Sequence, residues 1–291
     1  MTQAAHRRRM KNTSFRWGAR RKIFSGLLHV VLFGLAMLTL LPLLWMVMAS
    51  VMPAGEASRL PLRWWPSRVT WEHYAQLFAT LHLGRSFANS LLLSGAATLL
   101  SVTINSMAGY ALAKLPFVGR DRVFRALLAL LVVPGQVGML PLFLLLKELH
   151  WINTYWGVLV PSLASVFGIF LVRQYALGIP DALLDAARVD GAGELRVYWS
   201  VALPACRPIL TTLAVFTFIG TWNDFLWPLI VLTDDSMYTL PVALASLAGE
   251  HVQDTELMMA SAVLTMLPAI VLFLALQRAY LAGLLSGALK F

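Results

Sequence analysis

The residues best suited to chemistry in this chain of 291 residues lie in one polar stretch between two apolar runs, from Ile179 to Pro204. Pro180 and Asp181 open it, and an acidic side chain in the first turn of a helix interacts favourably with the helix dipole. A pair of alanines lets another surface approach closely, and the glycines that follow permit a sharp turn. We therefore expect a short amphipathic helix, a glycine break and a second helix, Glu194–Leu203, that ends at proline. Such a structured, charged segment is suited to dock on a soluble partner.

Catalytic chemistry has no comparable support in the sequence. None of the five lysines follows a glycine, so the phosphate-binding loop of an ATP-hydrolysing chain is missing. No Ser/His/Asp set, metal-ligand pattern or pair of carboxylates stands out. Cys206 is the only cysteine, which excludes an intramolecular disulfide and a cysteine-based metal site. We therefore expect no catalytic residue, cofactor or metal, and any ATP must be hydrolysed by another subunit.

The elements that hold this stretch are predicted to be membrane helices. The chain is 59% hydrophobic and 13% charged, against roughly 45–50% and 25% in soluble domains. A hydrocarbon core of about 30 Å is crossed by roughly 20 apolar helical residues. Runs of this length predict an all-α, polytopic membrane protein with six transmembrane helices and a helix in the 179–204 stretch. The runs lie near Leu27–Ala49, Ser86–Ala111, Phe124–Leu146, Trp156–Tyr175, Ile209–Leu232 and Met258–Tyr280.

The placement of the basic residues predicts the orientation. The net charge of +9 could suggest nucleic acid, but the basic cluster before the first run has no aromatic-interleaved binding module around it. With six spans and both termini in the cytoplasm, most Lys and Arg residues lie inside, as the positive-inside bias requires. We therefore expect an inner-membrane protein that contacts lipid, with a basic tail over residues 1–26 and no nucleic-acid partner. The basic residues left outside are Arg59, Arg63, Arg68, Arg85 and Lys147.

The first outside loop, roughly Ser50–Arg85, is rich in Trp and Pro. Tryptophan is enriched where lipid meets water, so an aromatic belt is the favoured interpretation. Stacking on a sugar ring is the alternative, since aromatic faces also bind sugars.

The polar stretch also carries a resemblance. Its Asp185-Ala186-Ala187, Gly191, Val201 and Leu203-Pro204 match, in spacing, the signature of the inner-membrane permeases of ABC importers. That signature is Glu-Ala-Ala, three residues, Gly, nine residues, an aliphatic residue, one more, then Leu-Pro. The resemblance implies that residues 179–204 form a coupling loop whose helix enters a cleft of the ATPase. Coupling residues would be Asp185, Ala186, Ala187, Asp190, Gly191, Leu203 and Pro204. Asp185 departs from the pattern, because it is one methylene shorter than glutamate.

A second segment, Phe218–Leu232 with Trp222-Asn223-Asp224, resembles the carbohydrate-uptake branch, as does the tail Gly283–Lys290. The likeness is to the second permease of maltose-type transporters and covers residues 27–291, a type-1 transmembrane domain. It implies as partners a homologous second permease, two ATP-binding subunits and a periplasmic or extracellular solute-binding protein. It also implies that the last outside loop touches the binding protein, with Gly249, Glu250 and Asp254 as candidates.

Three other interpretations remain at this point. An ion-coupled secondary transporter needs ionisable groups inside its spans, and Asp224 is the only acidic candidate well within one. For Trp222, Asn223 and Asp224 a structural or interfacial role is favoured over a place in the substrate pathway. An ABC permease for a non-sugar solute such as glycerol phosphate is the second alternative, and an assembly protein without transport activity is the third. Neighbouring genes for an ATPase and a binding protein would favour the importer.

Overall fold

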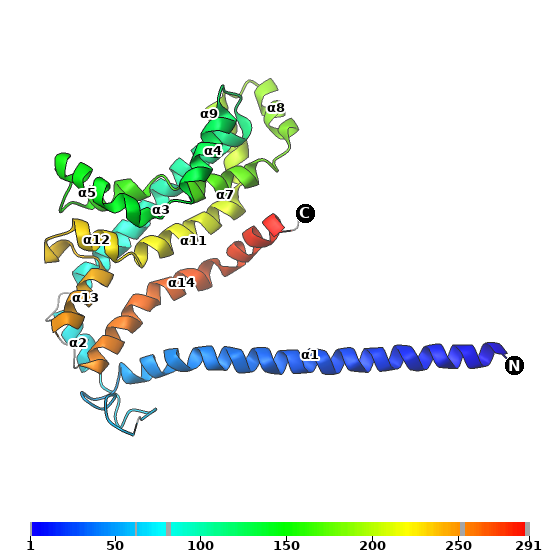
Figure 1. Cartoon of the computed structure of the whole chain (residues 1–291), viewed down its shortest axis with the longest axis horizontal. Coiled ribbons are helices and arrows are strands. Elements are labelled where there is room, and N and C mark those ends of the chain that lie inside the picture. The colour runs from blue at the N-terminus through cyan, green and yellow to red at the C-terminus, as the bar shows by residue number, and fades with distance from the viewer. Residues whose placement is uncertain (1, 62, 80–82, 251–253, 289–291) are drawn as a thin grey trace. The chain divides into compact units, whose positions relative to one another are not determined.

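The computed structural model describes the backbone of residues 2–61, 63–79, 83–250 and 254–288, and the side chains within 25–61, 63–79, 83–246 and 254–277. All regular structure in these ranges is helical, which confirms the predicted all-α class. The chain divides into two compact units, shown with the whole chain in Figure 1. The first unit joins Met1–His73 to Thr255–Ala260, and the second joins Tyr74–Asp254 to Ser261–Phe291.

Four helical segments in the described ranges are long and apolar enough to cross a membrane. Two further candidates arise if each of two sharply bent helix pairs counts as one span, which gives the predicted six. The four are Ser25–Ala49 in helix α1 (Thr2–Ala49), α3 (Leu83–Lys114), Tyr155–Ala176, and Thr255–Gln277 in α14 (Thr255–Ala288). Helix α1 runs without a break from the basic tail into the first span, so the division at residue 27 remains a prediction from charge.

The predicted third span is bent. Helix α4 (Arg120–Leu130) and the segment of η1 (Gly135–Gly138) and α5 (Met139–Glu148) meet at 95°. The break falls at Pro134, whose backbone at φ −59° and ψ 130° is extended. This value of ψ takes the backbone out of helical geometry, so the apolar run does not continue as one rod.

The prediction of one span over Ile209–Leu232 is wrong beyond Trp222. Helix α11 (Arg207–Trp222) ends there, and a separate short helix, α12 (Leu226–Val231), follows. Asn223 adopts φ −91° and ψ 0° at the end of α11, and its side-chain amide donates to the carbonyl oxygen of Ile219 at 2.9 Å. The segment that follows, predicted as the last outside loop, contains the helices η4 (Asp235–Met237) and α13 (Leu240–Glu250).

The second unit is organised around α3. Figure 1 shows α3 alongside α7 (Val166–Ala176) and α11, and both pack against it. The approach of α3 to α7 is close because Gly109 has no side chain: a Cβ there would lie 2.7 Å from Cβ of Val172. Small residues of this kind allow membrane helices to pack tightly.

Asparagine side chains complete the hydrogen bonding where helices break. Between α6 (Tyr155–Leu159), η2 (Val160–Ser162) and α7, Asn105 accepts from the backbone N–H of Ser165 at 2.9 Å and donates to the carbonyl of Leu163 at 3.3 Å. Asn153 accepts from the backbone N–H groups of Thr233 and Asp234, each at 3.0 Å. A backbone group freed within a bilayer must find such a partner inside the protein.

Candidate functional site

The first part of the 179–204 loop is the helix α8 (Asp181–Val189), which has one buried and one exposed face. Leu184 is 1% exposed and packs in the core with Ile179, Val197 and Tyr198. On the other side, Asp185 and Ala186 are exposed, and Val189 is 87% exposed. The core contact fixes the helix, and its outward face is left for another surface.

Helix α8 ends in a turn that needs glycine. Gly191 has φ +84°, in the left-handed region that other residues rarely adopt. Its N–H donates to the carbonyl of Arg188, and the N–H of Ala192 donates to that of Ala187, both at 3.0 Å. This pair of bonds is the Schellman pattern that closes a helix C-terminus. The predicted glycine break is therefore confirmed as a tight reversal of the chain.

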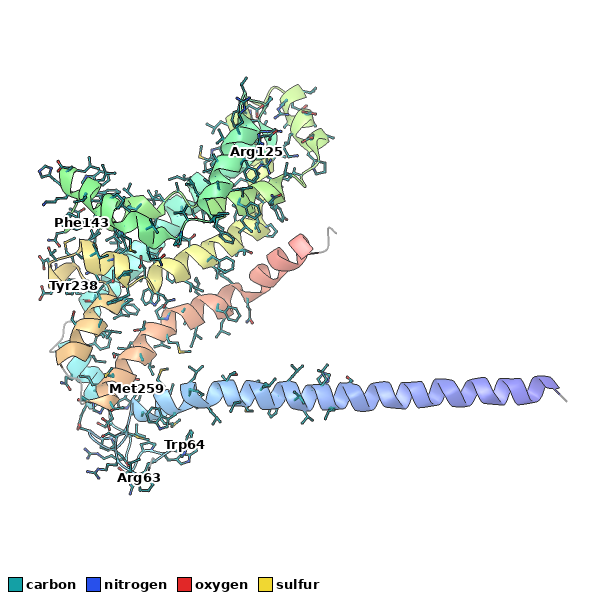
Figure 2. All side chains as sticks on the ribbon, viewed as in Figure 1. Arg63, Trp64, Arg125, Phe143, Tyr238 and Met259 are labelled. Atoms are coloured by element: carbon teal, nitrogen blue, oxygen red, sulfur yellow. The ribbon has the colours of Figure 1, made fainter. Side chains whose placement is uncertain are left out.

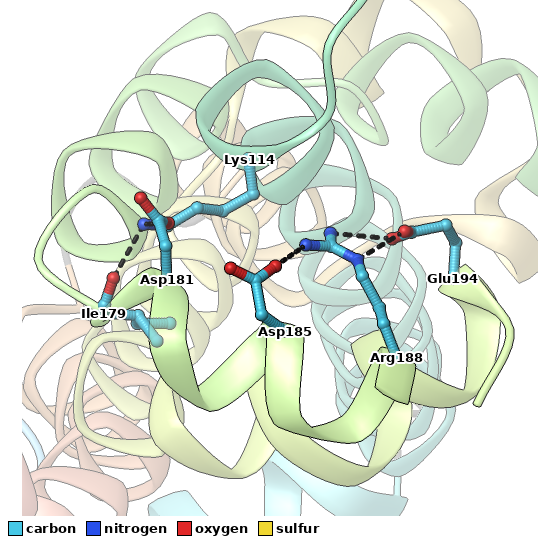
Figure 3. Close-up of polar contacts among 6 residues, drawn as sticks. All are labelled: Lys114, Ile179, Asp181, Asp185, Arg188 and Glu194. Carbon is cyan, nitrogen blue, oxygen red and sulfur yellow. Dashed lines mark hydrogen bonds and ion pairs between the residues drawn. The ribbon is translucent and has the colours of Figure 1, made fainter. Parts of the chain in front are cut away.

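Arg188 joins the two sides of this turn (Figure 3). Its Nη1 donates to Oδ1 of Asp185 at 2.7 Å, and its Nε and Nη2 donate to the two carboxylate oxygens of Glu194 at 2.8 and 3.3 Å. The bonds to Glu194, followed by those to Asp185, raise the pKa of Arg188 further above its ordinary value. Bidentate pairs of this kind fix geometry as well as charge. We call Asp185, Arg188 and Glu194 the charge clamp.

A second ion pair ties the start of α8 to α3. Lys114, the last residue of α3, donates from Nζ to Oδ1 of Asp181 and to the carbonyl oxygen of Ile179, both at 2.6 Å (Figure 3). The side chain of Lys114 is 6% exposed and that of Asp181 is 75% exposed. The hydrogen bond and charge of Lys114 lower the pKa of Asp181 below its ordinary value. Helix α8 is thus held to the end of a membrane-length helix.

The second arm of the loop continues further than predicted. It consists of α9 (Glu194–Val197), a π-helical turn η3 (Tyr198–Ala202) and α10 (Leu203–Ala205), so the helix ends after Ala205 and not at Pro204. Pro204 lies in the first turn of α10, directly after the π-helical turn η3. The arm then meets α11 at an angle of 80°.

This arm also rests on α3. The hydroxyl groups of Tyr198 and Ser106 lie 2.7 Å apart, and the rings of Tyr198 and Tyr110 have centroids 5.5 Å apart. Leu203 and Pro204 line an open cavity of about 600 Å³ beside it. Both arms of the loop therefore contact the same helix.

The predicted residues do not form one site. Asp185, Ala186, Ala187, Asp190 and Gly191 lie together on α8 and its C-terminal turn. Trp222 is fully buried, donates from Nε1 to the carbonyl of Thr265 at 2.9 Å and contacts the rings of Phe87 and Phe218. Asp224 accepts from the backbone N–H of Trp227 at the start of α12.

The third predicted group lies at the end of α13. The backbones of Gly249 and Glu250 belong to that helix, but their side chains and residues 251–253 lie outside the described part of the chain. Asp254 directly precedes α14 and is half-buried.

Sequence reasoning did not identify Lys114, Arg188 or Glu194 as members of the site. Arg188 stands three residues after Asp185 on a helix, a spacing at which oppositely charged side chains meet. The ion pair between these two residues could therefore have been predicted from the sequence. Lys114 is separated from Asp181 by 67 positions, and no local pattern joins them.

Comparisons with known proteins show the family and the fold of this chain. Residues 105–284 match the family described as "Binding-protein-dependent transport system inner membrane component". The arabinooligosaccharides transport system permease protein AraQ of Halalkalibacterium halodurans is 37% identical over 271 residues, which covers 92% of this chain and 97% of that protein. The melibiose/raffinose/stachyose import permease protein MelC of Bacillus subtilis is 32% identical over 228 residues, covering 77% and 83%.

A solved structure has the same fold. The crystal structure of a bacterial ABC transporter involved in the import of the acidic polysaccharide alginate contains a chain that matches with a TM-score of 0.78 and 24% identity, covering 88% of this chain and 96% of that one. The family match includes the whole 179–204 loop and more than half of the chain. Systems of this family combine such a permease with ATP-hydrolysing subunits and a solute-binding protein. The chain therefore belongs to the family of inner-membrane components of binding-protein-dependent transport systems, as a multi-pass permease of an ABC importer.

Proposed function

We propose that this permease imports an oligosaccharide or a related polar sugar. The observation that carries the proposal is the likeness, over nearly the whole chain, to relatives named for arabinooligosaccharides and for melibiose, raffinose and stachyose. A phosphorylated polyol such as glycerol phosphate is the alternative class. Deletion of the gene, followed by uptake of a panel of labelled saccharides and glycerol phosphate, tests the choice. Loss of saccharide uptake, restored by the gene on a plasmid, is expected, whereas selective loss of glycerol phosphate uptake would contradict it.

The working assembly is proposed to contain this chain, a homologous second permease, two ATP-binding subunits and an external solute-binding protein. The missing phosphate-binding loop supports a separate ATPase, since this chain has none of the residues that cradle ATP phosphates. Purification of the tagged permease from its native membrane, with the co-purified subunits counted by native mass spectrometry, tests this composition. A complex of two identical permease chains would contradict the hetero-oligomer.

Within this assembly, α8 is proposed to dock on an ATP-binding subunit. The exposed side chains of Leu183, Asp185, Ala186 and Val189 support this, because they give α8 an outward face with both apolar and charged groups. Asp190 and Gly191 complete the surface at its C-terminal end. Leu203 and Pro204 belong to the arm behind it and are proposed to fix the direction of α8.

We propose that Asp185 helps to position α8. One of its carboxylate oxygens receives a hydrogen bond from Arg188, so its charge is partly engaged within the chain. We expect a shorter, internally held carboxylate to orient α8 and not to act as the principal ion-pair partner of the ATPase. Asp185→Asn should then weaken coupling less than Asp185→Lys, which brings a second cation against Arg188. Stimulated ATPase activity and uptake in the two variants measure this difference.

The proposed orientation has both termini and the 179–204 loop in the cytoplasm. The excess of Lys and Arg in those segments supports it. Alkaline phosphatase and green fluorescent protein fused at the C-terminus test it, since phosphatase folds only outside and is expected to be inactive. An active phosphatase fusion would overturn the orientation.

The segment around Gly249, Glu250 and Asp254 is proposed to contact the solute-binding protein. Support comes from its acidic composition and from its place between α13 and α14. Deletion of Gly249–Asp254 should impair uptake and leave membrane insertion intact. Full uptake in the deletion strain would remove the proposal.

Trp222, Asn223 and Asp224 are proposed to be structural, because their contacts end α11 and begin α12.

A further inference from the structure

The segment between α1 and α2 (Glu72–Ala79), described over residues 51–61 and 63–71, forms an organised loop that we call the Trp loop. Its two ends meet where the N–H of Thr70 donates to the carbonyl of Val51 at 2.9 Å. Across its middle, the carboxylate of Glu56 accepts from the backbone N–H and the hydroxyl of Ser67 and from Arg63. The conformation of this loop is therefore held by its own hydrogen bonds.

The base of the Trp loop is attached to two membrane-length helices. Ala49 at the end of α1 and Met52 and Ala57 in the loop are buried together against Met259 of α14. The N–H of Ala57 also donates to Oε1 of Glu256, at 2.6 Å, in the first turn of α14. Since the membrane-length segment Ser25–Ala49 ends and Thr255–Gln277 begins at this point, we expect the loop to lie where these two helices leave the hydrocarbon layer.

Large apolar side chains project from this loop and are not covered by the described part of the chain. Leu60 is 91% exposed, Trp65 is 74% exposed and Trp64 is 49% exposed. Arg63 and Arg68 lie among them with side chains 63% and 71% exposed. Figure 2 shows Arg63 and Trp64 extending from the loop and Met259 near its base.

We propose that the Trp loop is an interfacial anchor that inserts Leu60, Trp64 and Trp65 into the headgroup region of the bilayer next to α1 and α14. Three observations point to lipid as the occupant: the loop is attached at the ends of two membrane-length helices, tryptophan is favoured at the membrane–water boundary, and the loop carries two exposed cationic side chains, Arg63 and Arg68, that suit phosphate headgroups. The internal hydrogen bonds hold the backbone, so the side chains can enter lipid while the polar groups of the loop remain satisfied.

The test measures depth in the membrane with a spin label in the complete transporter. Leu60→Cys, in a Cys206→Ser background, is labelled with a nitroxide and reconstituted in vesicles of phosphatidylethanolamine and phosphatidylglycerol. The frequency of collisions of the spin label with oxygen, which concentrates in lipid, is compared with its frequency of collisions with a water-soluble nickel chelate. The control position is Val118→Cys, a fully exposed residue in the loop between α3 and α4. A second variant adds Trp64→Ser and Trp65→Ser to Leu60→Cys.

Lipid insertion predicts a several-fold higher ratio of oxygen to nickel collisions at position 60 than at position 118, before any solute-binding protein is added. The two serine substitutions should move this ratio toward the aqueous value. A ratio at position 60 no greater than at position 118 would overturn the proposal. So would shielding that appears only with the binding protein, or a ratio unchanged by the serine substitutions, because both indicate that something other than tryptophan–lipid contact covers the loop.

Discussion

Arg188 and Glu194 face each other across the turn at Gly191, with both carboxylate oxygens of Glu194 within 3.3 Å of the guanidinium group. Glu194 begins α9, and Arg188 is in the last turn of α8. Their pairing therefore sets the angle between the proposed docking helix and the arm that rests on α3. The same guanidinium group also holds Asp185, so one side chain determines how three parts of the loop lie.

We predict that Arg188→Gln uncouples transport more than it destabilises the protein. An ion pair at a partly exposed site contributes at most about 1 kcal/mol, so assembly should persist, while the angle of α8 is no longer fixed. Uptake and stimulated ATPase activity should fall several-fold, and Glu194→Gln should have a similar but smaller effect. Arg196→Gln, which removes a cation from the exposed surface of the same arm, is the matched control. Equal losses in Arg188→Gln and Arg196→Gln would indicate a general effect of charge.

The pair of Lys114 and Asp181 predicts an acid-sensitive start of α8. Lys114, with a smaller effect of Arg188, lowers the pKa of Asp181 below its ordinary value. A carboxyl group with a depressed folded-state pKa contributes stability above its unfolded pKa, about 3.9 for Asp, and loses it as the pH falls through the folded pKa. Pepsin should therefore cleave near Leu183 readily only below about pH 4.

The control for this prediction is Asp181→Asn, which keeps the shape of the side chain and cannot titrate. Its cleavage, corrected for the activity of pepsin on an unfolded peptide, should show little change over the same pH range and should already be faster at pH 5. Parallel curves for the two proteins would mean that the pair with Lys114 does not hold the helix.

The extent of sequence prediction differed between elements for physical reasons. Apolar length located α1, α3 and α14, because burial in lipid requires long runs and imposes few other conditions. The end of α11 was missed because Asn223 and Asp224 are two polar residues inside a long apolar run, and a window average conceals a cap. The glycine turn at Gly191 was predictable from local backbone preference. The attachment of α8 to α3 was not, since it depends on Lys114 arriving from a distant part of the chain.

We predict that Asn105→Ala destabilises the second unit by about 1–3 kcal/mol, the cost of leaving buried polar groups without partners. The substitution removes the acceptor for the N–H of Ser165 and the donor for the carbonyl of Leu163, where the helix is already broken. Thr103→Ala is the control, because the hydroxyl of Thr103 bonds only to the carbonyl of Leu99 on its own helix. Thermal unfolding of the purified complex in detergent should show a clear decrease for Asn105→Ala and little change for Thr103→Ala. A similar stability for both variants would mean that water replaces the amide.

The contact of Gly109 with Val172 gives the sharpest test of the packing that supports the loop. A methyl group at position 109 would lie 2.7 Å from Cβ of Val172 and 3.0 Å from the backbone nitrogen of Arg173, so α3 and α7 must separate. Overpacking of this kind costs typically about 1–3 kcal/mol. Gly95→Ala, on the same helix with no atom within 4 Å of the added carbon, should instead be neutral or stabilising by up to about 1 kcal/mol.

A double-mutant cycle separates this steric effect from a general intolerance of α3 to substitution. Val172→Ala removes the γ-carbons but leaves Cβ, so it should recover only part of the stability lost in Gly109→Ala. Val172→Gly also removes Cβ. It should recover more, once the destabilisation caused by Val172→Gly alone is subtracted. Residues in contact show such coupling, and distant residues do not. Unfolding of the single and double variants in detergent measures the coupling energy. Additive effects would mean that α3 and α7 adjust independently, and that Gly109 does not set the distance between the two helices that carry the loop.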